Sequence, residues 1–470
     1  MGLNLGERLR RIREAGAKEG SAEESSARAG AGSLQLGEVK RVEKRPYPAE
    51  SAFPPEVLLG WESVGDRVSK SSTVLEEILH FPSVFPRSLA VLVPDTRHPA
   101  DALESPWLKP EDMLFFDLET TGLSAGSGTL AFLAAFGRLI PAENSSVPHK
   151  MDDPASCTRG PNNLTAFRLR VDQYLLLDYP GEAAFLEAVC AEFGRSRGQG
   201  EAGCGVKQPL VVSYNGKSFD AQILKNRCIT NGIRPPEFFH ADLLYAARRL
   251  WKRMLPGCSQ GQIEMLVLGL DRTGDTSGAL APEIWFNFLK TGEPGDLLGI
   301  CAHNKKDIRG LAFLMAALAA VALEPLENSA RFRCDIEALA LRWREFTRKD
   351  SPRYTRFLLG EAERKTGLAL LHHAAALNFP AAILALGRDL FKQNCYSKGR
   401  SLLLGLAEGN CPDGIKAAAF RSLAVDAEWR LKDRKTALDY TDRALALEGI
   451  TEGIRAAFIR RRERLVRGAG

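Results

Sequence analysis

The chain has 470 residues, of which 45% are hydrophobic and 26% are charged, and its formal net charge at pH 7 is +5. This length suits two or three domains with cores of ordinary size, and the composition excludes fibrous, disordered and membrane-embedded classes of protein. The small positive charge is compatible with a polyanionic partner but does not require one.

The nine cysteines include no C-x-x-C pair, and their odd number argues against a disulfide framework. No apolar run reaches the length of a transmembrane helix, and the first residues lack the apolar core of a signal peptide. We therefore expect a cytoplasmic protein with free thiols and no membrane association.

The first 108 residues divide into two regions. Residues 1–41 predict a basic helix at 5–15, which either touches nucleic acid or is a solvated terminal helix, followed by a disordered linker. Residues 42–108 predict an accessory region that packs beside the following core. Within it we expect a helix that begins at Ser72, with Glu76 in its first turn.

Residues 109–323 alternate strand and helix signals, which predicts an α/β domain with a mixed sheet and flanking helices. A polar, proline-rich stretch between Pro141 and Ala166 predicts a mobile surface insertion. The expected strands are 113–118, 129–139, 167–177 and 210–215, the second and third forming an antiparallel meander, and the expected helices include 182–193, 219–229 and one that contains residues 301–321.

Two carboxylates interrupt the first of these strands. Asp117 and Glu119 are two positions apart in an otherwise apolar run, so both project from the same face. Like charges at the end of a core strand repel each other and are costly to desolvate, which favours a divalent cation between them. The alternative is a strand end at which both acids face water.

Three further residues point to the same chemistry. Asp220 follows a strand and a glycine-containing turn, a location where sites collect in α/β sheets. The alternative is that the helix macrodipole alone favours an aspartate in the first turn of a helix. His303 and Asp307 share one face of an apolar helix. Either His303 is a general base beside the Asp307 carboxylate, or the two form a structural hydrogen-bonded pair. With Asp117 and Glu119, the acids suit a two-metal phosphodiesterase site.

The motifs DLETTGL, NGKSFD and HNKKD resemble the three motifs of the DEDD group of ribonuclease H-like 3′→5′ exonucleases. The chain is most similar to the YprB-like branch of that group, through GSGTLAFL, VDQYLLLD, HADLLYAARRLWKRML and IEMLVLG, over residues 114–323. The resemblance implies a ribonuclease H-like fold, two bound Mg²⁺ or Mn²⁺ ions, and single-stranded DNA or RNA as substrate. It implies metal ligation by Asp117, Glu119, Asp220 and Asp307, a base at His303, and substrate binding by Thr120, Thr121, Gly122, Leu123, Asn215 and Phe219.

Two features depart from the pattern of that group. His303 precedes Asp307 by four positions, as in the tyrosine-type subgroup, whereas the histidine-type subgroup usually spaces them by five. The base is therefore assigned less specifically than the acids. The segment DRTGDTSGALAPEIW lacks the expected Pro-Gly and aromatic pattern, so no substrate contact is assigned to Arg272 or Asp275.

Residues 350–470 predict an all-α helical-repeat domain. Two helix-turn-helix units, LALGRDLFKQNCYSKGRSLLLGLAEG and RSLAVDAEWRLKDRKTALDYTDRALALEG, resemble tetratricopeptide repeats. Such repeats offer a surface for a protein partner. The basic segment RAAFIRRRERLVRG either caps them or extends a nucleic-acid path.

The sequence therefore predicts a metal-dependent hydrolase of phosphodiester bonds, a 3′→5′ exonuclease on single-stranded DNA or RNA. One alternative is a nucleic-acid-binding scaffold whose repeats recruit a protein. The other is a structure-selective endonuclease, which the same metal site would support. Four intact acids argue against the scaffold, because a binder does not need crowded carboxylates.

Overall fold

The computed structural model of the chain describes residues 58–93, 108–122, 128–142, 164–194, 209–348 and 360–467. The predicted helix at 5–15 and the linker after it lie outside these ranges. Leu123 and most of the predicted insertion between Pro141 and Ala166 also lie outside them.

An eight-stranded mixed sheet forms the centre of the α/β part, as the sequence predicts. The strand order is β1-β2-β6-β5-β4-β7-β8, with β3 also paired to β6. β4 is antiparallel to β5 and parallel to β7, so it stands where the two kinds of pairing meet. The strands are β1 (Glu62–Gly65), β2 (Val68–Val74), β3 (Leu79–Pro82), β4 (Met113–Thr120), β5 (Ala131–Pro141), β6 (Leu164–Leu176), β7 (Leu210–Ser213) and β8 (Phe239–Asp242).

The helix predicted to begin at Ser72 is wrong, because this segment forms strands. β2 pairs antiparallel with β6 over its whole length, from Val68 opposite Leu176 to Val74 opposite Arg170. The Ser72 hydroxyl donates a hydrogen bond to Asp172 of β6 instead of capping a helix. The backbone groups of β6 offered a long-range partner that outweighs the local capping signal.

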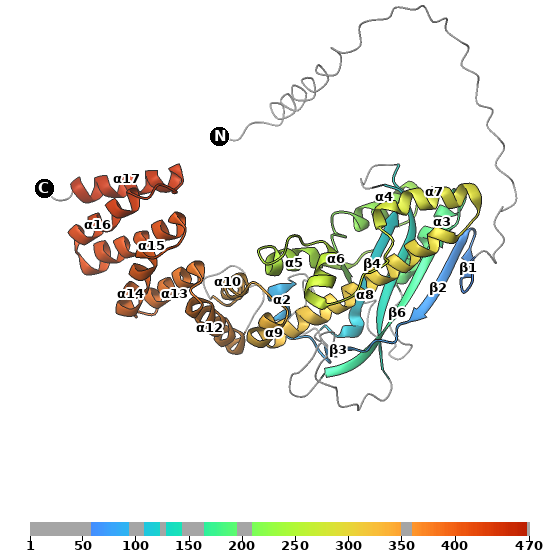
Figure 1. Cartoon of the computed structure of the whole chain (residues 1–470), viewed down its shortest axis with the longest axis horizontal. Coiled ribbons are helices and arrows are strands. Elements are labelled where there is room, and N and C mark those ends of the chain that lie inside the picture. Colours follow the sequence, from blue (N-terminus) through green and yellow to red (C-terminus); the bar gives the residue numbers. More distant parts are fainter. Residues whose placement is uncertain are drawn as a thin grey trace, which may run out of the picture. The chain divides into compact units, whose positions relative to one another are not determined.

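Helices cover both faces of the sheet, and side chains of β4 alternate between the two cores. Phe115 packs in the cluster that contains α5 and most of α8, whereas Phe116 packs in the cluster that contains α3, α4 and α7. The long helix α8 runs along the sheet (Figure 1). The helices of this part are α2 (Leu89–Leu92), α3 (Glu182–Gly194), α4 (Asp220–Thr230), α5 (Leu243–Trp251), α6 (Gln260–Ile263), α7 (Ala281–Thr291) and α8 (Gly295–Leu323), with short turns η2 (Pro110–Asp112), η3 (Tyr179–Gly181), η4 (Glu264–Leu268, a π-helix) and η5 (Gly278–Leu280).

Gly137 of β5 sets how closely α8 approaches the sheet. A Cβ at this position would lie 2.6 Å from Cγ2 of Ile308 and 3.0 Å from Cβ of Phe115. Ile308 follows Asp307 on α8, so the absence of a side chain at Gly137 helps to place the site residues of this helix.

We expect Gly137→Ala to lower the free energy of unfolding by about 1–3 kcal/mol, because the added methyl group overpacks the core. Urea unfolding followed by circular dichroism measures the change. Gly194→Ala is the control, because a Cβ at Gly194 meets no heavy atom within 4 Å. Equal stability of both variants would show that α8 can shift without cost.

The C-terminal part contains only helices in its described residues, in agreement with the predicted all-α region. α13 packs against α14, and α15 packs against α16, at the positions of the two predicted units. Their assignment to the tetratricopeptide type stays a prediction. The elements are α9 (Pro325–Arg331), α10 (Ile336–Thr347), α12 (Glu361–Ala376), α13 (Pro380–Lys392), α14 (Tyr396–Glu408), α15 (Asp413–Val425), η6 (Asp426–Leu431, a π-helix), α16 (Arg434–Leu445) and α17 (Glu452–Arg467).

The basic helix α17 uses several arginines in ion pairs within this part. Arg461 Nη1 lies 2.5 Å from Glu428 Oε2, and Arg462 Nε lies 2.7 Å from Asp442 Oδ1. These contacts favour the capping alternative for this segment. Across the described residues, no helix is both long and apolar enough to cross a lipid bilayer.

Candidate metal and nuclease site

The two acids of β4 lie at the end of the strand, as the sequence predicts. Glu119 is 9% exposed, and the pairing of β4 with β5 shifts register directly after it. Asp117 lies one pleat earlier, and its Oδ2 accepts a hydrogen bond of 2.7 Å from Nδ2 of Asn304. Both carboxylates are therefore held by a strand whose other side chains are buried in the core.

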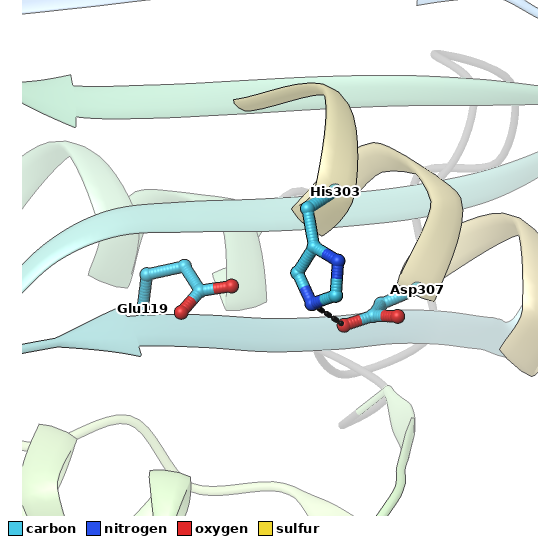
Figure 2. A group of neighbouring side chains, drawn as sticks. All are labelled: Glu119, His303 and Asp307. Carbon is cyan, nitrogen blue, oxygen red and sulfur yellow. Dashed lines mark ion pairs between the residues drawn. The ribbon is translucent and has the colours of Figure 1, made fainter. Parts of the chain in front are cut away.

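Helix α8 brings His303 and Asp307 to the same place. Figure 2 shows these two side chains on neighbouring turns of α8, with Glu119 of β4 across from them. His303 Nε2 lies 3.3 Å from Asp307 Oδ2. One ligand atom from each of Glu119, His303 and Asp307 lies within 4.8 Å of the other two, a spacing that can hold a metal ion.

Asp220 reaches the site from the turn between β7 and α4. Asn215 has a left-handed backbone with φ of 63°, and a Cβ on Gly216 would lie 2.3 Å from the Ser213 hydroxyl, so the turn needs a glycine there. Asp242 holds this turn by accepting hydrogen bonds from the backbone N–H groups of Asn215 and Lys217. Asp220 is the first residue of α4 and is 5% exposed.

The acids raise one another's pKa values. Burial, and then the charges of Asp307 and Asp220, raise the pKa of Glu119 to about 8. Burial, followed by Asp242 and Asp307, raises the pKa of Asp220 to about 8. The pKa of Asp117 is also raised well above its ordinary value, chiefly by burial and then by Asp307, Asp220 and Glu119. Although they lie on different elements, these carboxylates interact strongly enough to oppose joint ionisation.

This donor set fits a hard divalent cation. Mg²⁺ and Mn²⁺ prefer carboxylate oxygens, and a cation would relieve the mutual repulsion that raises the pKa values. The backbone of η5 approaches these donors closely at Gly278, where a side chain would crowd them. A Cβ on Gly278 would lie 3.1 Å from His303 Nε2 and 3.9 Å from Glu119 Oε2.

The turn residues predicted to bind substrate make local contacts. The Thr120 hydroxyl donates to the carbonyl of Gly122, and the Thr121 hydroxyl accepts from the N–H of Leu130. Leu123 lies outside the described residues. The turn is thereby tied to the start of β5, directly after the two acids.

The two other predicted substrate contacts differ in their surroundings. The side chain of Asn215 is exposed, at the turn that precedes α4. Phe219 is half-buried and packs against the core cluster that contains α3 and α7. The ring of Phe219 therefore has a structural role beside any contact with a nucleotide.

Sequence reasoning did not assign a role to Asn304, which lies inside the HNKKD motif. Asn304 is 0% exposed and joins Asp117 to Gln173 of β6, whose Nε2 donates to Asn304 Oδ1 over 3.0 Å. Gln173 Nε2 also donates to the carbonyl of Cys301, 2.8 Å away. This chain of hydrogen bonds fixes the orientation of the Asp117 carboxylate. A buried amide next to a site histidine was the signal available in the sequence.

The segment between η4 and η5 contributes two more residues to which the sequence analysis assigned no role. Arg272 forms ion pairs with Glu264, Asp275 and Asp307. Asp275 in turn lies 2.9 Å from His303 Nδ1, measured from Oδ2. Arg272 and Asp275 thus contact the site directly, although the sequence assigned them no part in it.

Comparison with known proteins identifies the fold. Residues 198–319 match the family model RNase_H_2 of the RNase_H superfamily, and this range includes Asp220, His303 and Asp307. The chain contains a ribonuclease H-like domain. The chain is also 34% identical over 206 residues to the uncharacterized protein YprB of Bacillus subtilis (strain 168). The aligned residues make up 43% of this chain and 41% of that protein. The aligned part thus spans about two fifths of this relative.

Proposed function

We propose that this chain is a metal-dependent nuclease that removes nucleotides from the 3′ end of single-stranded DNA or RNA. The observation that carries the proposal is the meeting of Glu119, His303 and Asp307 within 4.8 Å, beside the buried acids Asp117 and Asp220. These five residues lie in the three segments that resemble the motifs of the DEDD exonucleases. A site built for binding alone would gain nothing from several buried carboxylates of raised pKa.

In this proposal the four acids hold two divalent ions, Mg²⁺ or Mn²⁺. Such ions, when bound, supply activation of water and stabilisation of the leaving oxygen in an in-line displacement at phosphorus. His303 accepts the proton of the attacking water at Nε2, the ring nitrogen that faces Asp307 and Glu119. Asn304 keeps the Asp117 carboxylate turned toward the other acids through the hydrogen bond to Oδ2.

Two features beside the acids, the turn that follows β4 and the short helix η5, are where we expect the 3′ end of the nucleic acid to bind. The turn that follows Glu119 is tied back by Thr120 and Thr121. In this proposal Gly122 of that turn contacts the terminal nucleotide. Gly278 of η5 lies close to His303 Nε2, which a Cβ at this position would approach to 3.1 Å. In this proposal the reacting phosphate lies between the turn that follows Glu119 and η5.

The test uses the purified full chain with 5′-labelled single-stranded DNA and RNA oligonucleotides, in Mg²⁺, Mn²⁺ or EDTA, beside Asp117→Ala. We expect a ladder that shortens by one nucleotide from the 3′ end, present with metal and absent with EDTA and in the variant. The preferred sugar follows from comparison of the two substrates. A second set of oligonucleotides that carry a 3′-phosphate should be degraded more slowly.

Each other outcome has a definite meaning. Binding without cleavage in either metal would contradict the nuclease and favour the nucleic-acid scaffold. Cuts within the oligonucleotide that ignore the 3′-phosphate would contradict exonuclease action and favour an endonuclease. Cleavage that persists in Asp117→Ala would place the activity outside this acid cluster.

A further inference from the structure

The imidazole of His303 is held from both of its nitrogen atoms. Nδ1 lies 2.9 Å from Oδ2 of Asp275, and Nε2 lies 3.3 Å from Oδ2 of Asp307. The Nδ1 contact is a hydrogen bond, whereas the Nε2 contact with Asp307 is within ion-pair distance but has no hydrogen-bond geometry in the described structure. A carboxylate accepts hydrogen bonds and cannot donate them, so Asp275 favours the tautomer with the proton on Nδ1. That tautomer leaves Nε2 as the acceptor toward the acid cluster.

Asp275 is itself fixed from two sides. Its Oδ2 accepts from Nη1 of Arg272 over 2.8 Å, and its Oδ1 lies 3.2 Å from Nζ of Lys306. The carboxylate is 11% exposed, and the two cations keep it from turning away from His303. The contact between Asp275 and the imidazole therefore belongs to a network of ion pairs that fixes both side chains.

Arg272 connects this arrangement to the metal-ligand candidates. The same guanidinium pairs with Asp307 and with Glu264 of the π-helix η4. Glu264 reaches it because α8 has a glycine at 310, where a Cβ would lie only 1.8 Å from Glu264 Oε1. A π-helical turn and a glycine thus make room for one arginine among three carboxylates.

We propose that Asp275 is a positioning residue of the nuclease: it fixes the tautomer and ring orientation of His303. Arg272, which pairs with both Asp275 and Asp307, fixes the position of the Asp275 carboxylate relative to Asp307. This inference rests on the proposed function for its kinetic consequences. Its structural consequence, the Nδ1–H tautomer of His303, is independent of catalysis. Asp275 acts through His303 and needs no contact with the nucleic acid.

The kinetic test compares Asp275→Asn with the wild-type chain on a 3′-labelled oligonucleotide. An asparagine side chain can turn its amide N–H toward Nδ1 and so favour the wrong tautomer, and we expect kcat to fall by about 100-fold or more. KM should stay within about threefold, because no substrate contact is lost. Asp275→Glu should restore part of kcat. Asp271→Asn is the matched control, since Asp271 is an exposed acid of the same segment whose carboxylate accepts hydrogen bonds from the N–H and the hydroxyl of Thr273.

A double variant tests whether the two residues act as one unit. If Asp275 works through His303, Asp275→Asn should cost no further activity in a His303→Asn background. Calorimetric titration with Mn²⁺ should give the same stoichiometry for Asp275→Asn as for wild type. Additive losses in the double variant, or a loss of metal binding or of thermal stability in the single one, would show a structural role and overturn the proposal.

The tautomer is measured directly by nuclear magnetic resonance of the ¹⁵N-histidine-labelled chain, with the His303 signals identified by their absence in His303→Asn. We expect Nδ1–H for His303 in the wild-type chain, in Asp271→Asn and in Asp275→Glu, and a shift toward Nε2–H in Asp275→Asn. If wild type shows Nε2–H, the proposal fails even when the chain cleaves nucleic acid. If wild type shows Nδ1–H but does not cleave, the proposed function fails and the pairing of Asp275 with His303 stands.

Discussion

Glu119→Gln should reduce metal-dependent cleavage by about 1,000-fold or more, which corresponds to roughly 4 kcal/mol of transition-state stabilisation. Glutamine has the shape of glutamate but no charge, and Glu119 is the β4 member of the group whose ligand atoms lie within 4.8 Å of one another. Single-turnover cleavage of a 5′-labelled oligonucleotide in Mn²⁺ measures the change. Glu187→Gln is the control, because Glu187 is an exposed acid on α3, outside the site.

Although Glu119→Gln should lower activity, it should raise the thermal stability of the metal-free protein. Burial and neighbouring acids raise the pKa of Glu119 from 4.5 to about 8. A folded-state pKa above the unfolded value means that the contribution of this group to stability is lost as the pH rises from about 4 to about 8. Glutamine mimics the protonated form, so in EDTA we expect Glu119→Gln to melt higher than wild type at pH 8 and equally at pH 4.

Added Mn²⁺ should then raise the melting temperature of wild type more than that of Glu119→Gln, since a ligand that binds only the folded state stabilises it. Thermal melts at both pH values, with and without the metal, give all four comparisons. A variant that cleaves normally, or that melts lower than wild type in EDTA at pH 8, would contradict the role of Glu119 as a crowded metal ligand.

The sequence predicted those parts of the fold that local patterns specify. The apolar run of β4 with its two interruptions identified a buried strand and two carboxylates on one face, and the structure places both at the strand end. The four-residue spacing of His303 and Asp307 predicted a shared helical face, which Figure 2 shows. Periodicity is a property of neighbouring residues, so it can be read without knowledge of tertiary contacts.

The parts that sequence reasoning missed depend on long-range contacts. The segment around Ser72 has a helix-start signal, yet β6, about a hundred residues later, takes it as a strand. Asn304 acquires its role only because Asp117, 187 residues earlier, lies within hydrogen-bond distance. Arg272 and Asp275 stand in a segment that departs from the family pattern, and only the packing of η4 and α8 shows what they contact.

Arg272→Met should be the most destabilising single change near the site. Arg272 is 10% exposed and forms ion pairs with Glu264, Asp275 and Asp307, of which Glu264 is 2% exposed. Removal of one partner from buried ion pairs costs about 3–5 kcal/mol, because the remaining charges are left uncompensated. We expect the melting temperature in EDTA to fall by about 10 °C, at roughly 2–4 °C for each kcal/mol.

Two further variants separate the loss of charge from the loss of geometry. Arg309→Met removes an arginine of α8 that pairs with Glu77, a half-exposed acid, and should cost about 1 kcal/mol or less. Arg272→Lys keeps the charge but cannot contact three carboxylates with one planar fork, so its melting temperature should lie between those of wild type and Arg272→Met. Because Arg272→Met leaves Asp307 without its internal cation, Mn²⁺ should raise the melting temperature of this variant more than that of wild type. Equal melting of Arg272→Met and Arg309→Met would mean that the acids do not need the arginine, and that water or protonation balances their charge instead.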